Sequence, residues 1–198
     1  MKLVLATQNP KKLNEMNEIL SHLGVEVVSE AELGVRIEVE ETGETFTDNA
    51  RLKATAVMQA TGLPAVADDS GLCVDALNGG PGVYSARFGG EGLDDKGRYT
   101  LLLEMLRGQT DRAAHFHTSI VCAFPNGDEL VCEGECPGTI AFAPMGEGGF
   151  GYDPVFFVPE LRKTFGQLTA EEKASVSHRG KALRAFAAAL DDYLKGNE

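Results

Sequence analysis

The sequence has 198 residues, a formal net charge of −12 and 43% hydrophobic residues. A chain of this length buries roughly 70% of its unfolded surface, so it needs neither disulfides nor a structural metal to form a core. No apolar run approaches the ~20 residues of a membrane span, and the acidic balance argues against non-specific binding to nucleic acid or membranes. We expect one domain over residues 1–198 with two lobes, in the cytoplasm with reduced cysteines, because we find no secretory signal.

The first part of the chain alternates strand and helix signals. Residues 2–6 form a short apolar run that predicts a strand. Asn9 can cap a helix, and Pro10 fits the first helical position, where no backbone donor is needed. Apolar residues recur at helical spacing through residues 13–23, and residues 25–28 predict a second strand.

A second helix and a buried strand follow. Alanine and valine recur at helical spacing after Thr47, and Gly62 ends this helix just before a proline. Residues 65–67 are small and apolar, which predicts a buried strand. We expect this strand to end at Asp68, because Asp-Ser-Gly is common turn chemistry.

Residues 79–92 and 144–154 are glycine-rich and predict loops. Near the C-terminus, Thr169 and Glu172 have the spacing of a capping box at a helix start. A helix with one apolar face then covers residues 183–194.

A hairpin lies between the two loops. Apolar runs at 116–124 and 129–132 are joined by Asn126-Gly127, a strong hairpin signal, and 138–143 is a third strand-like run. We predict an α/β fold with a mixed sheet, helices on its faces, and a hairpin insertion around 113–143 in the second lobe.

Two literal motif matches do not predict a cofactor site. Residues 146–151 match the dinucleotide fingerprint, but a strand or turn follows them where a helix is required. His115 and His117 could pair as metal ligands, but their alternation is typical of ordinary strand side chains, which we favour.

Groups suited to phosphate and metal follow two of the strands. In Thr7-x-Asn9-x-x-Lys12, backbone amides at a helix start and a lysine favour an anion, unless Asn9 only caps the helix. Asp68 and Asp69 follow a strand, at the edge where open α/β sheets bind ligands, although a structural turn is the alternative.

Three further segments each have a functional and an ordinary interpretation. The acids of residues 38–41 either hold a cation or form a solvated edge. In Gly148–Pro154 the glycines allow close approach, and Phe150 or Tyr152 offers a face to a base, unless the segment is a plain connector. His178-Arg179 places two donors at a helix start.

The combination favours a nucleoside triphosphate over a sugar or a peptide. Mg²⁺ prefers one or two carboxylates together with phosphate oxygens and waters. The chain offers separate lysines for a polyanion, acids for Mg²⁺ and an aromatic glycine loop for a base.

Seven blocks in this order resemble the inosine triphosphate pyrophosphatase family over essentially the whole chain. They are Thr7-x-Asn9-x-x-Lys12, Glu40-Glu41-Thr42-Gly43-x-Thr45-Phe46, Asn49-Ala50-x-x-Lys53-Ala54, Ala67-Asp68-Asp69-Ser70-Gly71-Leu72, Pro81-Gly82-Val83-Tyr84-Ser85-Ala86-Arg87, Gly148–Pro154 and Ser177-His178-Arg179-Gly180.

The resemblance implies an elongated mixed sheet with two lobes and a central nucleotide cleft. It also implies hydrolysis of ITP, dITP and XTP to the monophosphate and pyrophosphate, with Mg²⁺, in a cytosolic homodimer. Such an enzyme removes deaminated purines from the nucleotide pool.

The resemblance assigns roles as well. Asp69 is our candidate general base, acting on a water beside the metal, with Lys12 and Lys53 as cationic catalytic groups. For the second metal ligand we favour Glu40 over Glu41, both being candidates beside Asp69. The implied substrate-binding residues are Thr7, Gln8, Asn9, Pro10, Lys11, Lys12, Ser70, Phe150, Gly151, Tyr152, Asp153, Lys173, His178 and Arg179.

Donors such as His178 and Arg179 would satisfy the C6 keto oxygen of hypoxanthine or xanthine and reject adenine. The alternatives are a Maf-like pyrophosphatase, which lacks the block at 177–180, a nucleotide-binding regulator, which would lack Asp69 or Glu40, and a structural domain. The last would leave the lysines and acids unexplained.

Overall fold

The structure is a computed structural model. It describes residues 1–7 and 9–196, with only the backbone described at Pro10 and Lys11. One mixed sheet has the strand order β2-β1-β3-β4-β5-β6-β7, which confirms the predicted α/β class. β1 is parallel to β2 and β3, whereas β6 is antiparallel to β5 and β7. The strands are β1 (Lys2–Leu5), β2 (Glu26–Ser29), β3 (Ala65–Val74), β4 (Ala113–Ala123), β5 (Glu129–Ile140), β6 (Phe156–Val158) and β7 (Lys163–Thr164).

The helices agree closely with the sequence pattern. They are α1 (Pro10–Leu20), α2 (Phe46–Thr61), α3 (Asp95–Met105), α4 (Ala170–Val176) and α5 (His178–Gly196). α1 begins at Pro10, and the capping box of Thr169 and Glu172 starts α4. None of the described helices, which lie within residues 1–7 and 9–196, is long and apolar enough to cross a membrane.

Helix α2 begins earlier than predicted. We expected a start after Thr47, but the helix starts at Phe46 because Thr45 is the N-cap and its hydroxyl accepts a hydrogen bond from the Asp48 amide at 3.1 Å. The predicted end is confirmed, since Gly62 closes the helix at φ 67°, a backbone conformation that favours glycine.

Two strands are longer than predicted. β3 continues through Asp68 to Val74, so the prediction that it ends at the acids was wrong. The turn-like residues are tolerated because β1 pairs with β3 only as far as Val66 and leaves the following positions open on that side. β5 also runs unbroken to Ile140, so the first half of the separately predicted run at 138–143 continues the hairpin.

The chain forms two compact units. Unit 1 comprises residues 1–69, 118–134 and the chain from Lys181 onward, and unit 2 comprises residues 70–117 and 135–180. The boundary therefore falls within β3, β4 and β5, and the β4–β5 hairpin contributes residues to both units. A single domain with the hairpin in its second lobe stays a prediction.

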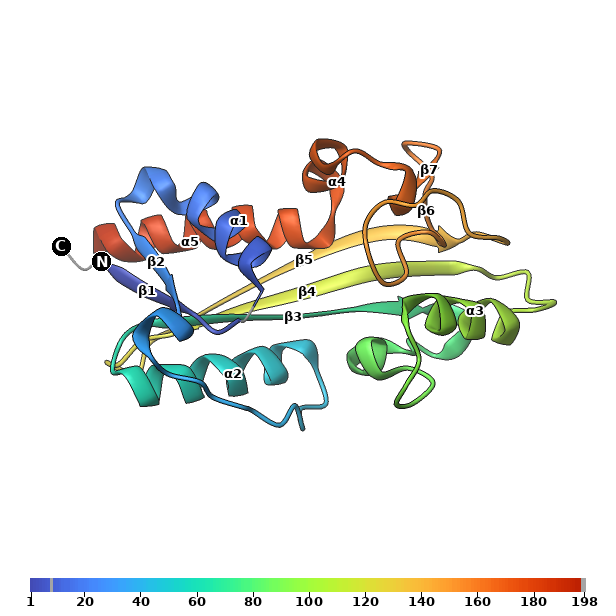
Figure 1. The fold of residues 1–198 in the computed structure, drawn as a ribbon. Coiled ribbons are helices and arrows are strands. Elements are labelled where there is room, and N and C mark those ends of the chain that lie inside the picture. Colours follow the sequence, from blue (N-terminus) through green and yellow to red (C-terminus); the bar gives the residue numbers. More distant parts are fainter. Residues whose placement is uncertain (8, 197–198) are drawn as a thin grey trace. The chain divides into compact units, whose positions relative to one another are not determined.

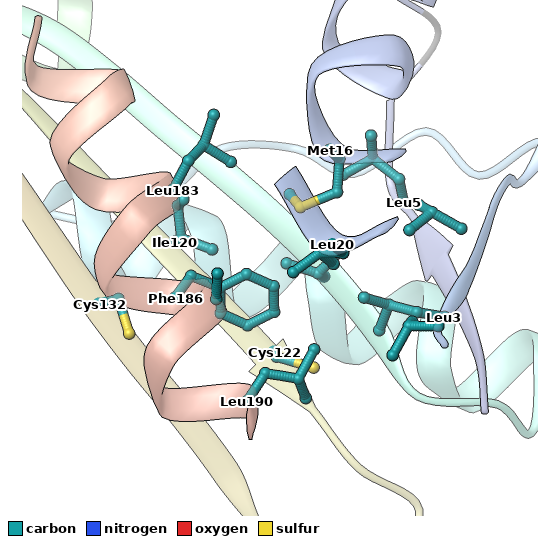
Figure 2. Packing of buried hydrophobic residues seen from close by; sticks show 14 of the residues in the cluster. Leu3, Leu5, Met16, Leu20, Ile120, Cys122, Cys132, Leu183, Phe186 and Leu190 are labelled. Atoms are coloured by element: carbon teal, nitrogen blue, oxygen red, sulfur yellow. The ribbon is translucent and has the colours of Figure 1, made fainter. Parts of the chain in front are cut away.

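Unit 1 packs helices on both faces of its strands. Leu3 and Leu5 of β1 pack with Met16 of α1 and Phe186 of α5 in one core (Figure 2). Val4, between them, faces the other way and packs against Val57 of α2. Figure 1 shows α1 and α5 on one face of these strands and α2 on the opposite face.

Unit 2 has its own core, centred on three phenylalanines. The ring centroid of Phe116 lies 4.7 Å from that of Phe156 and 5.6 Å from that of Phe165. Leu102 of α3 is completely buried in the same cluster. All four cysteines are free thiols, and Cys122, Cys132 and Cys136 are buried.

Candidate active site

The acidic pair of β3 lies directly beyond the end of β1. The last paired residues are Leu5 of β1 and Val66 of β3, and the Ala6 amide adds a hydrogen bond to the Val66 carbonyl at 2.9 Å. Successive residues of a strand point to opposite faces, so Asp68 and Asp69 face different helices. The β1–β3 pairing thus ends before both acids, so β1 does not pair with Asp68 or Asp69.

Asp68 faces α1. Its Oδ2 atom lies 2.7 Å from Lys12 Nζ, and its side chain is 3% exposed whereas that of Lys12 is 32% exposed. Lys12 lies in the first turn of α1, where the helix amides already favour negative charge. The ion pair therefore places a cation beside the helix start.

Asp69 faces α2, where Lys53 contacts two carboxylates. Lys53 Nζ lies 2.7 Å from Glu41 Oε1 and 3.5 Å from Asp69 Oδ1. The Asn49 amide nitrogen donates to Asp69 Oδ2 at 3.2 Å. One ammonium is thus shared by two acids, which leaves net negative charge at this point.

Burial and charge shift the pKa values of this cluster. Burial raises the pKa of Asp69, and repulsion from Glu41 adds to the shift, while Lys53 and Asn49 oppose it. Burial lowers the pKa of Lys53, but attraction to Asp69 and Glu41 outweighs burial and gives a net rise. Asp69 is therefore a better proton acceptor than an ordinary surface aspartate.

The structure separates the two glutamates proposed as metal ligands. Glu41 is half-buried against Lys53, whereas Glu40 is exposed. Glu38, on the same acidic segment, lines a cavity that Lys53 also lines. Of Glu40 and Glu41, only Glu41 is brought to the Lys53 contact with Asp69.

Two cavities of about 280 Å³ each adjoin these residues. Thr7 and the buried Glu30 line both of them. Lys53 lines one cavity, and Asn9 lines the other. The Asn9 backbone amide also donates to Thr7 Oγ1 at 3.2 Å, so Thr7 and Asn9, both predicted phosphate contacts, are adjacent.

Within residues 1–7 and 9–196, no three His, Cys, Asp or Glu side chains are arranged to hold a metal ion by themselves. His117 instead contacts Glu135, with Nδ1 and Oε1 3.1 Å apart. Two carboxylates with room for other oxygen ligands are the arrangement that Mg²⁺ takes with phosphates. Glu41 and Asp69 have that donor chemistry.

A second cluster of predicted site residues lies in unit 2. Lys173 Nζ is 2.5 Å from Asp153 Oδ2 and 4.7 Å from the centre of the Phe150 ring. Asp153 is 2% exposed, while Phe150 is 76% exposed. Burial raises the pKa of Asp153, although Lys173 opposes the shift. The exposed ring beside a cation can accept a stacked aromatic ligand.

Tyr152 has a different position from Phe150. Its hydroxyl donates to the Ser85 carbonyl at 2.8 Å in the interior, and its side chain is buried, which raises the pKa of the phenol. The Gly151 amide donates to Asp95 Oδ2 at 2.7 Å. Of the two aromatic residues proposed to stack on a base, the structure exposes Phe150 and uses Tyr152 to hold the loop.

His178 begins α5 beside the aromatic core of unit 2. Its ring is stacked on Phe116 at 4.7 Å between centroids, with 12° between the planes. Arg179 follows half-buried. At Gly180 a Cβ atom would lie 2.0 Å from the Ala174 carbonyl oxygen, so glycine is required for the close approach of α4 and α5.

The structure describes only some of the remaining predicted site residues. Ser70 follows Asp69 in β3 and is half-buried. Gln8 lies outside the described residues, as do the side chains of Pro10 and Lys11. The sequence interpretation assigned no role to Asn49 or Asp95, although Asn49 is a polar residue on the apolar face of α2 and could have been noticed there.

Comparisons with known proteins identify the family. Residues 3–189 match the model of the Ham1 family. The chain is 50% identical over 99% of its length to a dITP/XTP pyrophosphatase of Exiguobacterium, covering 100% of that protein, and 53% identical over 97% to one of Thermus thermophilus, covering 93%. It also resembles the solved Ham1 protein of Coxiella burnetii, with a TM-score of 0.93, 43% identity and coverage of 97% and 99% of the two chains. By sequence and by fold, the chain belongs to the Ham1 family.

Proposed function

We propose that this protein hydrolyses dITP, XTP and ITP to the nucleoside monophosphate and pyrophosphate. The relatives that carry the name dITP/XTP pyrophosphatase share about half of its residues over nearly the whole chain. The observation that carries the proposal is the contact of Lys53 with both Glu41 and Asp69 beside a cavity lined by Thr7. This arrangement suits a metal-bound polyphosphate better than a neutral ligand.

Glu41 and Asp69 are proposed to hold Mg²⁺. Their carboxylates outnumber the one ammonium between them, so a divalent cation would relieve their repulsion. Bound Mg²⁺ neutralises phosphate charge and lowers the pKa of a coordinated water. Glu40, which is exposed, becomes the less favoured ligand.

Asp69 is the proposed general base. Its Oδ2 atom accepts from Asn49, whereas Oδ1 has the longer 3.5 Å contact with Lys53, so Oδ1 is the proposed acceptor of the proton from the attacking water. A carboxylate with a raised pKa holds a proton more readily at neutral pH. The water then attacks the α-phosphorus, and the bond to pyrophosphate breaks.

The leaving pyrophosphate gains negative charge, which cations and amides must stabilise. Lys12 and the first turn of α1 are proposed to stabilise this charge, with Thr7 and Asn9 as neutral donors. Lys53 is proposed to lie near the reacting phosphate. Three further residues of the same segment stay predicted substrate contacts: Gln8, Pro10 and Lys11. Ser70 stays a predicted substrate contact because it follows Asp69.

The base is proposed to stack on Phe150, next to Lys173, with Gly151, Tyr152 and Asp153 shaping the loop. His178 and Arg179 are proposed to donate to the C6 keto oxygen, which adenine lacks. A nucleotide cleft between two lobes stays a prediction from the resemblance, as do the cytoplasmic homodimer and the absence of nucleic-acid partners. Light scattering of the protein as it elutes from a size-exclusion column measures its molar mass and so tests whether it is a dimer.

A pyrophosphate-release assay over dITP, XTP, ITP, GTP, ATP and dUTP, with Mg²⁺ or with a chelator, tests the function. We expect Mg²⁺-dependent release from the first three and little from ATP. Preferred turnover of dUTP would favour a Maf-like pyrophosphatase. Tight binding of dITP without any turnover would favour a regulator.

A further inference from the structure

We propose that Asn49 is a positioning residue that holds the catalytic carboxylate of Asp69 in register with the segment that carries Glu41. The inference rests on the proposed function, because it assigns Asn49 to the machinery of that reaction. Asn49 itself needs no contact with the nucleotide.

Both polar atoms of the Asn49 side-chain amide form hydrogen bonds. Its Nδ2 donates to Asp69 Oδ2 at 3.2 Å, and its Oδ1 accepts from the Gly43 backbone amide at 2.8 Å. The residue is completely buried. Because one end is a donor and the other an acceptor, the two partners fix the orientation of the amide.

Gly43 fits this contact only as glycine. A Cβ atom there would lie 2.7 Å from Asn49 Oδ1 and 2.9 Å from the Asn49 backbone nitrogen, both too close. The backbone of the acidic segment therefore approaches α2 directly, two residues after Glu41. Asn49 fixes this approach from within the helix.

Asn49 and Lys53 act on Asp69 from one face of α2. They are four residues apart, which places them one helical turn from each other on the same side. Lys53 contacts Asp69 Oδ1 and Asn49 contacts Oδ2, so each oxygen has a different partner. Asn49 thereby keeps Oδ1 turned toward Lys53 and Glu41.

A purely structural role would require only a side chain that fills the space among the alanines of α2. Ala50 and Ala54 of the same helix are also completely buried, and neither brings a side-chain polar group into the interior. The amide is needed instead because the Gly43 donor and the Asp69 acceptor would otherwise each lose a partner. Both partners belong to segments that carry candidate metal ligands.

The test compares Asn49→Asp with Asn49→Ala. Aspartate is nearly isosteric and still accepts from Gly43, but it no longer donates to Asp69 and places a like charge there. Alanine removes both contacts. Asn17→Asp is the matched control, since Asn17 lies in unit 1 on α1 and donates to the Val27 carbonyl, away from these residues.

Two measurements are made on each variant. In steady-state hydrolysis of dITP, we expect Asn49→Asp to lower kcat by ~10- to 100-fold, as loss of a supporting contact does, with KM little changed. In amide hydrogen exchange of the free protein, we expect Gly43 to stay protected in Asn49→Asp and to lose protection in Asn49→Ala. Asn17→Asp should leave both measurements as in the wild type.

The inference is overturned if Asn49→Asp keeps wild-type kcat, or if its loss lies in KM alone. It is also overturned if the Gly43 amide stays protected in Asn49→Ala. A wild-type protein that hydrolyses none of the nucleotides would refute the proposed function and with it the catalytic part of this role. The exchange result would still report separately on the contact between Asn49 and Gly43.

Discussion

Asp68 and Asp69 are consecutive residues of β3, yet their carboxylates bind lysines from helices on opposite faces of the sheet. Asp68 Oδ2 lies 2.7 Å from Lys12 Nζ of α1, and Asp69 Oδ1 lies 3.5 Å from Lys53 Nζ of α2. The pairing of β1 with β3 ends at Val66, before the two acids, so β1 does not pair with either of them. Adjacent acids thus gather the cations of two helices around one strand.

Removing the ionisable carboxylate of Asp69 tests its role as the general base. We expect Asp69→Asn to lower kcat for dITP by at least ~10²-fold, a typical size for loss of a general base. Asparagine keeps the shape and can still accept the Asn49 hydrogen bond, so the fold should survive. Pyrophosphate release at saturating dITP measures the effect.

Asp191→Asn is the control for that experiment. Asp191 lies on α5 and pairs with Lys195 on the surface of unit 1, so its loss changes the charge equally without touching the site. An Asp69→Asn enzyme as fast as the Asp191→Asn enzyme would remove Asp69 from the chemistry.

The two neighbouring glutamates allow a sharper test of the metal site. Glu41 contacts Lys53 at 2.7 Å, whereas Glu40 is exposed. We expect Glu41→Gln to raise the Mg²⁺ concentration needed for half-maximal rate by at least ~10-fold, and Glu40→Gln to change it much less. Calorimetric Mg²⁺ titration of the free proteins provides a second readout. The reverse order would restore the preference for Glu40.

Phe150 is the exposed aromatic ring that we expect to stack on the base. Stacking of a base on an aromatic side chain contributes about 1–3 kcal/mol, so Phe150→Ala should raise KM for dITP by roughly 5- to 150-fold. Stability should change little, because the ring is 76% exposed. Initial rates over a range of dITP concentrations measure KM.

Phe142 provides a closely matched control. It is 82% exposed, belongs to the same unit, and lies under a cation, with Arg112 4.4 Å from its ring centre. Phe142→Ala should leave KM unchanged. If both variants behave alike, the effect comes from exposed aromatic surface in general and not from a base subsite.

Local signals predicted the elements but not all of their ends. Pro10, Gly62 and the Thr169 capping box marked helix boundaries correctly, because each acts through nearby backbone groups. The extension of β3 through Asp68 depends on its neighbours in the sheet, and no short pattern encodes those. For the same reason the sequence pointed to Asp69 and Lys53 yet gave no role to Asn49, whose two partners are 6 and 20 residues away.

The ionisation of the Asp153 carboxyl makes the stability of the folded protein depend on pH. Burial raises its pKa in the folded protein above the ordinary value of 3.8, even with Lys173 beside it. Below pH 3.8 the carboxyl is protonated in both states. As the pH rises, the unfolded chain ionises first, so the wild type loses stability until the pH passes the raised folded pKa.

Asparagine cannot ionise and can still accept from the Phe150 amide, which contacts Asp153 Oδ2 at 2.8 Å. We therefore expect Asp153→Asn to unfold at a higher temperature than the wild type at pH 7, by about 2–4 °C for each kcal/mol gained. The difference should shrink toward zero as the pH is lowered to 3.8 and below. Calorimetric scans from pH 3 to pH 8 measure it, and a variant that is less stable at pH 7 would show that the Lys173 ion pair outweighs the cost of burying the charge.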